Sequence, residues 1–158
     1  MDRLMMIQDK VKNYLDKQIQ YESDYNSTIQ RLRSIGVNSD SPTVNIEKSK
    51  FEQRIRVIQN EYEEVFSVFA VLKDSIRSHF GEGDDRHDEY IGRCYTAVSN
   101  AESLIRQHIT PYKFEYMRNG YIQKPTQRCI RYDYVTNVLY NGEMFNYLRR
   151  LLRNIGEL

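Results

Sequence analysis

The sequence has little cysteine, and what it has forms no motif. Its two cysteines, Cys94 and Cys129, lie 35 residues apart and make no Cys-x-x-Cys pair. This spacing argues against a disulfide-stabilised scaffold and against a zinc finger, which need more sulfur in closer groups. Two thiols outside any pattern are typical of small buried side chains in a reducing compartment, so we expect a cytoplasmic protein.

Glycine, proline, long apolar runs and an excess of either charge are also scarce. Seven Gly and three Pro in 158 residues argue against an all-β fold and against a disordered linker. The mean hydropathy is −0.72, and no stretch approaches the ~18 apolar residues that a membrane span requires. Gln8, Asp9 and Lys10 interrupt the apolar start, so we expect no secretory segment. The 23 Lys and Arg against 22 Asp and Glu exclude a histone-like protein. Composition therefore predicts a soluble, mainly helical chain without indicating an activity.

The first helical pattern covers residues 4 to 35. Apolar and aromatic residues recur at alternating spacings of four and three, interrupted only at Gln18 and Thr28. Such a seam is typical of a coiled coil or of an antiparallel helix pair. Gly36 follows the last apolar position, where a helix commonly ends in a left-handed residue. The seam consists of Leu4, Ile7, Val11, Tyr14, Tyr21, Tyr25, Leu32 and Ile35.

A second helix is predicted after a polar connector over residues 37–45, with Thr43 or Asn45 as its N-cap. Its apolar ladder is unbroken, and Gly81 closes it. Additional apolar residues widen the stripe toward the C-terminus, which predicts contact with more than one neighbouring helix. The ladder consists of Phe51, Ile55, Ile58, Tyr62, Val65, Phe69, Leu72 and Ile76, and the widening residues are Val57, Phe66, Val68 and Val71.

These two helices predict a long antiparallel hairpin, because the connector between them is short. Each would be about 45–50 Å long, which is more than an ordinary small bundle needs. We therefore expect the hairpin to associate with copies of itself, and the expected division is residues 1–80 for the hairpin and 81–158 for a C-terminal helical part. The expected self-association seam consists of Phe66, Phe69, Leu72 and Ile76.

A compact helical part is predicted after residue 81. Asp84 or Asp85 caps a third helix, and the Thr110-Pro111 step ends it. An alternating segment around Asn119-Gly120 has the strongest short-range pattern of a β-hairpin.

The end of the chain is predicted to be helical as well. Residues 126–140 fit either a helix or a strand, and the helix is favoured because Asn141-Gly142 would supply a C-cap. A final amphipathic helix follows from residue 144. The predicted fold class is therefore all-α and mainly helical, with room for one β-hairpin.

Basic residues and tyrosines gather in residues 111–158, with eight Lys and Arg against four Asp and Glu, and seven of the thirteen tyrosines. Aromatic rings that stack on bases, with arginines on phosphates, often hold single-stranded nucleic acid. The same residue types are enriched in protein–protein hot spots, and packed tyrosines would give the same composition. We favour a protein partner, because the whole chain is nearly neutral. The expected partner surface consists of Tyr112, Tyr116, Arg118, Tyr121, Arg128, Arg131 and Tyr132.

The densest ionisable cluster lies between His79 and Glu89. Imidazole and carboxylate ligands could hold a divalent metal there, but Arg86 and His87 occupy positions where an EF-hand needs oxygen ligands. We interpret the cluster as a solvated, acidic helix N-terminus. The chain has no HExxH, no G-x-S-x-G and no Gly-rich phosphate loop, and Cys94 lies on an apolar helix face. We therefore expect no catalytic residue, metal or cofactor.

These patterns predict a non-enzymatic binding or assembly protein. It would act through helical self-association and through the Tyr/Arg-rich partner surface, with a protein partner, a homo-oligomer and no membrane. The alternative is a nucleic-acid-binding protein that uses the basic, aromatic C-terminal region. A metal-dependent hydrolase built on residues 79–89 is the third hypothesis.

Overall fold

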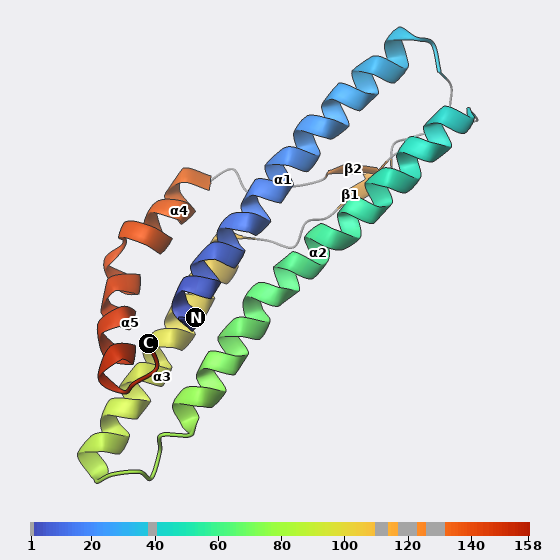
Figure 1. Ribbon diagram of the computed structural model, residues 1–158. Helices are drawn as coiled ribbons and strands as arrows, with labels where there is room; N and C mark the ends of the chain where they lie inside the picture. The colour runs from blue at the N-terminus through green and yellow to red at the C-terminus, as the bar shows by residue number, and fades with distance from the viewer. Residues whose placement is uncertain (1, 38–40, 110–113, 117–122, 126–131) are drawn as a thin grey trace. The chain divides into compact units, whose positions relative to one another are not determined.

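The computed structural model describes residues 2–37, 41–109, 114–116, 123–125 and 132–158. These residues form five helices: α1 (Arg3–Ser34), α2 (Pro42–Arg77), α3 (Asp85–His108), α4 (Tyr132–Asn141) and α5 (Glu143–Asn154). Two strands of three residues each, β1 (Phe114–Tyr116) and β2 (Gln123–Pro125), pair antiparallel (Figure 1). The predicted fold class is confirmed: a long antiparallel hairpin of α1 and α2 is followed by a helical C-terminal part.

The end of α1 follows the prediction closely. Gly36 has φ +72°, and the N–H of Val37 donates to the carbonyl of Leu32 at 3.1 Å. The N–H of Gly36 donates in turn to the carbonyl of Arg33. These two bonds are the Schellman arrangement, which satisfies the last helical carbonyls when a residue adopts the left-handed conformation.

The start of α2 differs from the prediction of Thr43 or Asn45 as N-cap. The helix begins at Pro42, and the hydroxyl of Ser41 accepts from the Thr43 N–H at 3.2 Å. Proline is favoured at the first helical position because the N–H that it lacks would have no intrahelical partner there. The helix therefore begins earlier than the apolar ladder, since its first turn is set by Ser41 and Pro42.

Helix α3 begins as predicted, with Asp84 as its N-cap. The Asp84 carboxylate accepts from the His87 N–H at 3.0 Å, and the Asp88 carboxylate accepts from the Gly81 N–H at 2.9 Å. Gly81 itself has φ +83°, in the region that favours glycine. The acidic segment between α2 and α3 is therefore a hydrogen-bonded connection.

The strand register agrees with the predicted β-hairpin, because Tyr116 pairs with Gln123 and Phe114 with Pro125. The Asn119-Gly120 turn that would join these strands lies outside the described residues. Helix α4 confirms the helical alternative for its part of residues 126–140.

Helix α4 ends at Asn141, where Asn141-Gly142 was predicted to cap it, and the Gly142 N–H donates to the Val138 carbonyl at 3.2 Å. Gly142 has φ −74° and is the N-cap of α5, so it does not form a left-handed end of α4. A Cβ on Gly142 would lie 2.5 Å from the carbonyl oxygen of Val138. Glycine is needed at this position because the backbone of α4 approaches closely, and its φ is not unusual.

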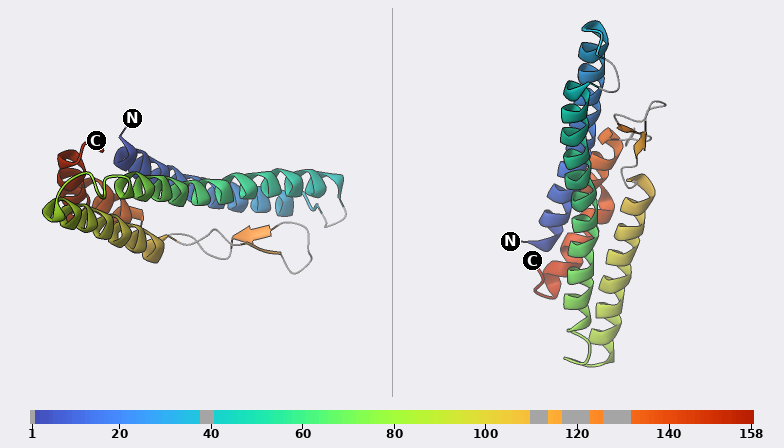
Figure 2. Two further views of the ribbon diagram at one scale, coloured as in Figure 1. Left: turned by 90° about the horizontal axis from the view of Figure 1, so that it is seen from below. Right: turned by 90° about the vertical axis from the view of Figure 1, so that its right-hand side faces the viewer.

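The chain forms two compact units. Unit 1 consists of Met1–Lys12, Glu63–Thr110 and Arg131–Leu158, and unit 2 of Asn13–Tyr62 and Pro111–Ile130. Both units contain parts of α1 and α2, which lie side by side in both views of Figure 2. These units are groups of residues that pack together. The domain division predicted from the sequence, residues 1–80 and 81–158, stays a prediction.

Unit 1 packs the first turns of α1 and the last part of α2 with α3, α4 and α5. Polar contacts join its ends: the buried Gln8 side chain donates to the Leu139 carbonyl and accepts from Arg149 at 3.0 Å. Arg149 also bonds Asp2 at 2.8 Å. The core contains Leu4, Ile7, Phe69, Leu72, Ile76, Ile91, Cys94, Val98 and Leu152, all fully buried. Aliphatic packing across five helical segments therefore stabilises this unit.

Candidate interaction groove on the helical hairpin

Unit 2 is held together by aromatic side chains from both long helices. The Tyr21 ring meets the Phe51 ring edge-on at 5.2 Å between centroids, and Tyr25 meets the same ring at 5.9 Å. Tyr14 and Tyr62 form a further pair at 5.4 Å. Aromatic pairs in such geometries add about 0.5–1.5 kcal/mol each beyond the apolar area that they bury. The pKa of Tyr21 is raised, mainly by burial and further by the neighbouring Tyr25 hydroxyl. The charge of Arg54 acts in the opposite direction but does not outweigh them.

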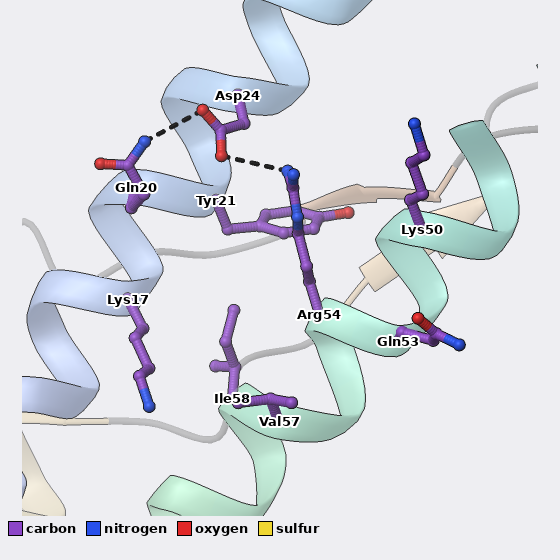
Figure 3. Close-up of a pocket in the computed structure, with 9 residues that line it drawn as sticks. All are labelled: Lys17, Gln20, Tyr21, Asp24, Lys50, Gln53, Arg54, Val57 and Ile58. Carbon is purple, nitrogen blue, oxygen red and sulfur yellow. Dashed lines mark hydrogen bonds and ion pairs between the residues drawn. The ribbon is translucent and has the colours of Figure 1, made fainter. Parts of the chain in front are cut away.

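An open groove of about 460 Å³ lies between α1 and α2 in this unit. Figure 3 shows side chains from both helices around it. The nearly buried Tyr21 and Ile58 form its floor, Val57 is the exposed apolar side chain beside them, and charged and amide groups supply the rest. The described lining residues are Lys17, Gln20, Tyr21, Asp24, Lys50, Gln53, Arg54, Val57 and Ile58.

Two ion pairs join α1 and α2 at the groove; three of their four residues line it, as does Lys50 one turn beyond Arg54, while Glu61 does not. In one pair the Lys17 ammonium contacts the Glu61 carboxylate. In the other, Arg54 Nη1 lies 3.0 Å from the Asp24 carboxylate, and Gln20 donates to the same carboxylate at 3.0 Å (Figure 3). The polarity is opposite in the two pairs, since α1 supplies the cation in one and the anion in the other.

Exposed aliphatic side chains accompany the groove on α2. Val57 lines it and keeps 49 % of its surface exposed, and Ile46, further along the same helix face, keeps 58 %. An aliphatic side chain that stays half exposed beside a groove is a common feature of surfaces that bind a partner, although single exposed apolar residues are ordinary.

The predicted self-association seam lies inside the chain. Phe69, Leu72 and Ile76 are fully buried, and Phe66 is 9 % exposed with the Arg106 guanidinium 3.8 Å above its ring. Contacts from α1 and α3 cover this part of α2, which agrees with the expectation of several neighbours for that half. The chain itself therefore uses these four residues as core. Self-association stays a prediction, and it needs a different surface.

The predicted partner surface falls largely on residues that the structure does not describe. Tyr112, Arg118, Tyr121, Arg128 and Arg131 are outside the described residues. The backbones of Tyr116 and Tyr132 belong to β1 and α4, but their side chains are not described. The Tyr/Arg-rich partner surface therefore stays a prediction.

The ionisable cluster at residues 79–89 contacts the C-terminal segment through His79, and Asp84 and Asp88 accept from backbone N–H groups within the cluster itself. His79 Nε2 lies 2.8 Å from the Glu157 carboxylate, and its Nδ1 lies 3.1 Å from Glu82. The Ser75 hydroxyl donates to Glu157 at 2.7 Å, and Arg3 lies 3.2 Å from the same carboxylate. Within the part of the chain that the structure describes, no three His, Cys, Asp or Glu side chains are grouped to hold a metal ion.

Two side chains with nucleophilic atoms in this unit, Ser75 and Cys94, have structural contacts. The Ser75 hydroxyl donates to the Glu157 carboxylate, and His79 contacts the same carboxylate, so Ser75 and His79 are joined through Glu157 and do not form a Ser–His pair. Cys94 is fully buried, and burial raises the pKa of its thiol, which favours the less reactive protonated form. Cys94 therefore packs in the core, as its place on the apolar face of α3 predicted.

Comparison with known proteins adds no family. The chain matches no family model, and it is similar to no curated protein and no solved structure. No helix in the described ranges combines the length and the apolar character needed to cross a bilayer.

The sequence patterns missed the groove residues Lys17, Asp24 and Arg54, and Glu61, which pairs with Lys17. Apolar periodicity does not reveal them, because these charges stand beside the apolar seam. Their signal in the sequence is the spacing: an oppositely charged residue follows seven positions later on each helix, which returns to the same face.

Proposed function

We propose that this protein is a non-enzymatic assembly protein that self-associates through the groove-bearing face of its helical hairpin. The observation that supports this is the open groove on unit 2, where an apolar floor lies between polar rims. Clefts of this composition are typical binding sites. The apolar seam that would otherwise have mediated association is already buried within the chain.

Two further observations favour a binding role over catalysis. The thiol of Cys94 is buried in the core, and the hydroxyl of Ser75 is bonded to a carboxylate. Neither group lines the groove. These two side chains therefore serve the fold, which favours a binding role. We also propose a cytoplasmic location, because a buried thiol outside any motif is suited to a reducing compartment.

Two exposed valines on α2 provide a matched test. Val57 lines the groove and is 49 % exposed, whereas Val71 lies elsewhere on the same helix and is 51 % exposed. We expect wild-type protein to form a concentration-dependent oligomer in sedimentation velocity. Val57→Asp should weaken it at least about tenfold, because a carboxylate would be buried in the interface. Val71→Asp should associate like the wild type. A strict monomer at high concentration, or equal effects of both variants, would contradict the proposal.

The nucleic-acid alternative makes a separate prediction. If the C-terminal region binds RNA or DNA, replacing Arg118, Arg128 and Arg131 by Gln should reduce the log–log salt slope by up to about one unit for each phosphate that is no longer neutralised. We expect little binding of single strands at physiological salt. Micromolar or tighter binding with a steep salt slope would favour the alternative.

A further inference from the structure

We infer that the groove on unit 2 receives the same groove of a second copy, and that four charged side chains fix the alignment of the two copies. This inference rests on the proposed self-association and names its partner. The four residues are Lys17 and Asp24 on α1 and Arg54 and Glu61 on α2. Three of them line the groove, and Glu61 lies beside it in contact with Lys17; we call these four positions the corners.

The corners form a checkerboard of charge. Lys17 pairs with Glu61 across the hairpin, and Asp24 pairs with Arg54. On each helix the two corners are seven residues apart, which is about 10 Å along the axis and nearly the same angle around it. Moving from any corner to the next, along a helix or across the hairpin, therefore changes the sign of the charge.

A checkerboard of this kind is complementary to itself. Two copies that meet face to face are related by a two-fold axis in the plane of the interface, as in most homodimers. If that axis crosses the helices, Lys17 faces Asp24 of the second copy and Glu61 faces its Arg54. If the axis follows the helices, Lys17 faces Glu61 of the second copy. Every corner meets an opposite charge in both cases.

The corner side chains are open enough to accept these additional contacts. The exposed fractions are 42 % for Lys17 and 21 % for Glu61, and 47 % for Arg54 and 36 % for Asp24. Each ion pair within the chain thus leaves part of both charged groups open to a second partner. Networks of charges align interfaces more effectively than isolated pairs do, and like charges placed opposite each other exclude wrong partners.

The apolar groups lie between the corners. Tyr21, Val57 and Ile58 line the groove there. Tyr21 and Ile58 are only 2 % exposed and form the floor, so Val57, at 49 %, is the apolar side chain that a second copy would cover. Its burial would make the centre of the interface dry while the charges form the rim. This is the usual arrangement of a protein interface.

A charge exchange tests the inference without removing a pair inside the chain. The exchange variant combines Lys17→Glu with Glu61→Lys, and Asp24→Arg with Arg54→Asp. Each ion pair within the hairpin keeps its partners with reversed polarity, and the net charge of the chain is unchanged. Two copies of the exchange variant remain complementary, but a wild-type copy against an exchange copy places like charges at every corner.

We expect wild type and exchange variant each to form homodimers, and their mixture to form few heterodimers. Native mass spectrometry of isotopically distinguished chains, mixed and re-equilibrated, measures the three species. The heterodimer should account for less than about a tenth of all dimers, where random pairing gives half. Heterodimers at the random fraction would overturn the inference and leave self-association intact. A wild-type chain that stays monomeric would overturn both.

A control exchange uses two cross-hairpin pairs that do not line the groove. Arg31 pairs with Glu47 at 3.0 Å, and Lys10 pairs with Glu64 at 2.9 Å. Exchanging the residues within both pairs alters as many charges on the same two helices. This control variant should mix with wild type at the random fraction. Depletion of its heterodimer as well would show that the groove corners do not set the alignment.

Two half-exchange variants keep the inference testable if the full exchange does not fold, and they also identify the axis. One variant exchanges only Lys17 with Glu61, and the other only Asp24 with Arg54. If the axis crosses the helices, the two variants complement each other and heterodimers dominate their mixture. If the axis follows the helices, each complements itself and homodimers dominate. Random pairing of the half-exchange variants would overturn the inference.

Discussion

The side-chain carboxylate of Glu157, next to the last residue of the chain, gives the sharpest prediction for stability. Its side chain is only 7 % exposed, and it accepts hydrogen bonds from Ser75 at 2.7 Å and from His79 at 2.8 Å. Arg3 adds a contact at 3.2 Å, but its side chain is 39 % exposed, so solvent screens that pair. Glu157→Gln removes the charge and turns an amide N–H₂ toward these donors.

We expect Glu157→Gln to lower the free energy of unfolding by about 2 kcal/mol. A hydrogen bond to a charged, largely buried group contributes about 1.5–3 kcal/mol, and glutamine keeps one acceptor oxygen for part of the network. For a chain of this size the loss corresponds to a decrease in Tm of about 4–8 °C. Urea unfolding followed by circular dichroism measures it.

The effect should depend on pH in a defined direction. The hydrogen bond that His79 donates to Glu157 raises the pKa of His79 above 6.5; burial opposes this shift, and Glu82 supports it. The stabilisation from this bond is therefore complete below pH 6.5 and is lost as pH rises through the raised pKa. Burial opposes ionisation of Glu157, but bonds from Ser75 and His79 outweigh it and lower its pKa below 4.5. That contribution is complete above 4.5 and is lost as pH falls further. The free energies of unfolding of wild type and Glu157→Gln should therefore differ most between pH 4.5 and 6.5.

Glu82→Gln is the matched control. Glu82 also bonds to His79, but its side chain is 56 % exposed, so we expect a loss of at most about 0.5 kcal/mol. If Glu157→Gln unfolds within about 0.5 kcal/mol of wild type, or if its difference from wild type is the same at about pH 9 as at about pH 5.5, the reasoning is refuted.

Further changes test the packing. Gly142→Ala should lower the free energy of unfolding by about 2 kcal/mol or more, because its Cβ would lie 2.5 Å from the Val138 carbonyl oxygen. Gly92→Ala, where a Cβ meets open space within α3, should raise it by about 0.5–1 kcal/mol in the same urea titration. Phe69→Ala in the fully buried core should cost about 3–5 kcal/mol, measured by the same unfolding curve. Cys94 should react with a thiol reagent only as fast as the native chain opens, and rapid labelling of that thiol in folded protein would contradict its burial.

Apolar periodicity predicted the two long helices because their buried faces are regular. Every ladder position from Phe51 to Ile76 is buried or half-buried, and Gly36 ends α1 where the seam ends. The cap of α2 was misplaced because Ser41 and Pro42 act through local hydrogen bonding, before any apolar residue enters the pattern.

The sequence could not say which partner covers an apolar row. Phe66 and Phe69 have the pattern of an interface between copies, yet helices of the same chain bury them. An apolar stripe indicates that a helix face is buried, but it does not identify the surface that covers it. Burial within the chain and burial between two chains therefore give the same sequence pattern. The groove was missed for a related reason, since it depends on which charges α1 and α2 bring together across the hairpin.

The assembly of unit 1 from three separate stretches of chain has a consequence for folding. Arg3 and Glu157 meet in that unit, so its last contacts form only after nearly all of the chain has been synthesised. The residues Asn13–Tyr62, in contrast, lie close enough in sequence to pair α1 with α2 early. Contacts between residues far apart in sequence slow folding, because the entropy cost of closing the loop between them comes before the contact can stabilise the chain. We therefore expect hydrogen exchange during refolding to protect the hairpin amides of residues 13–62 first and those of α4 and α5 last, with the N-terminal turns of α1 protected together with the latter.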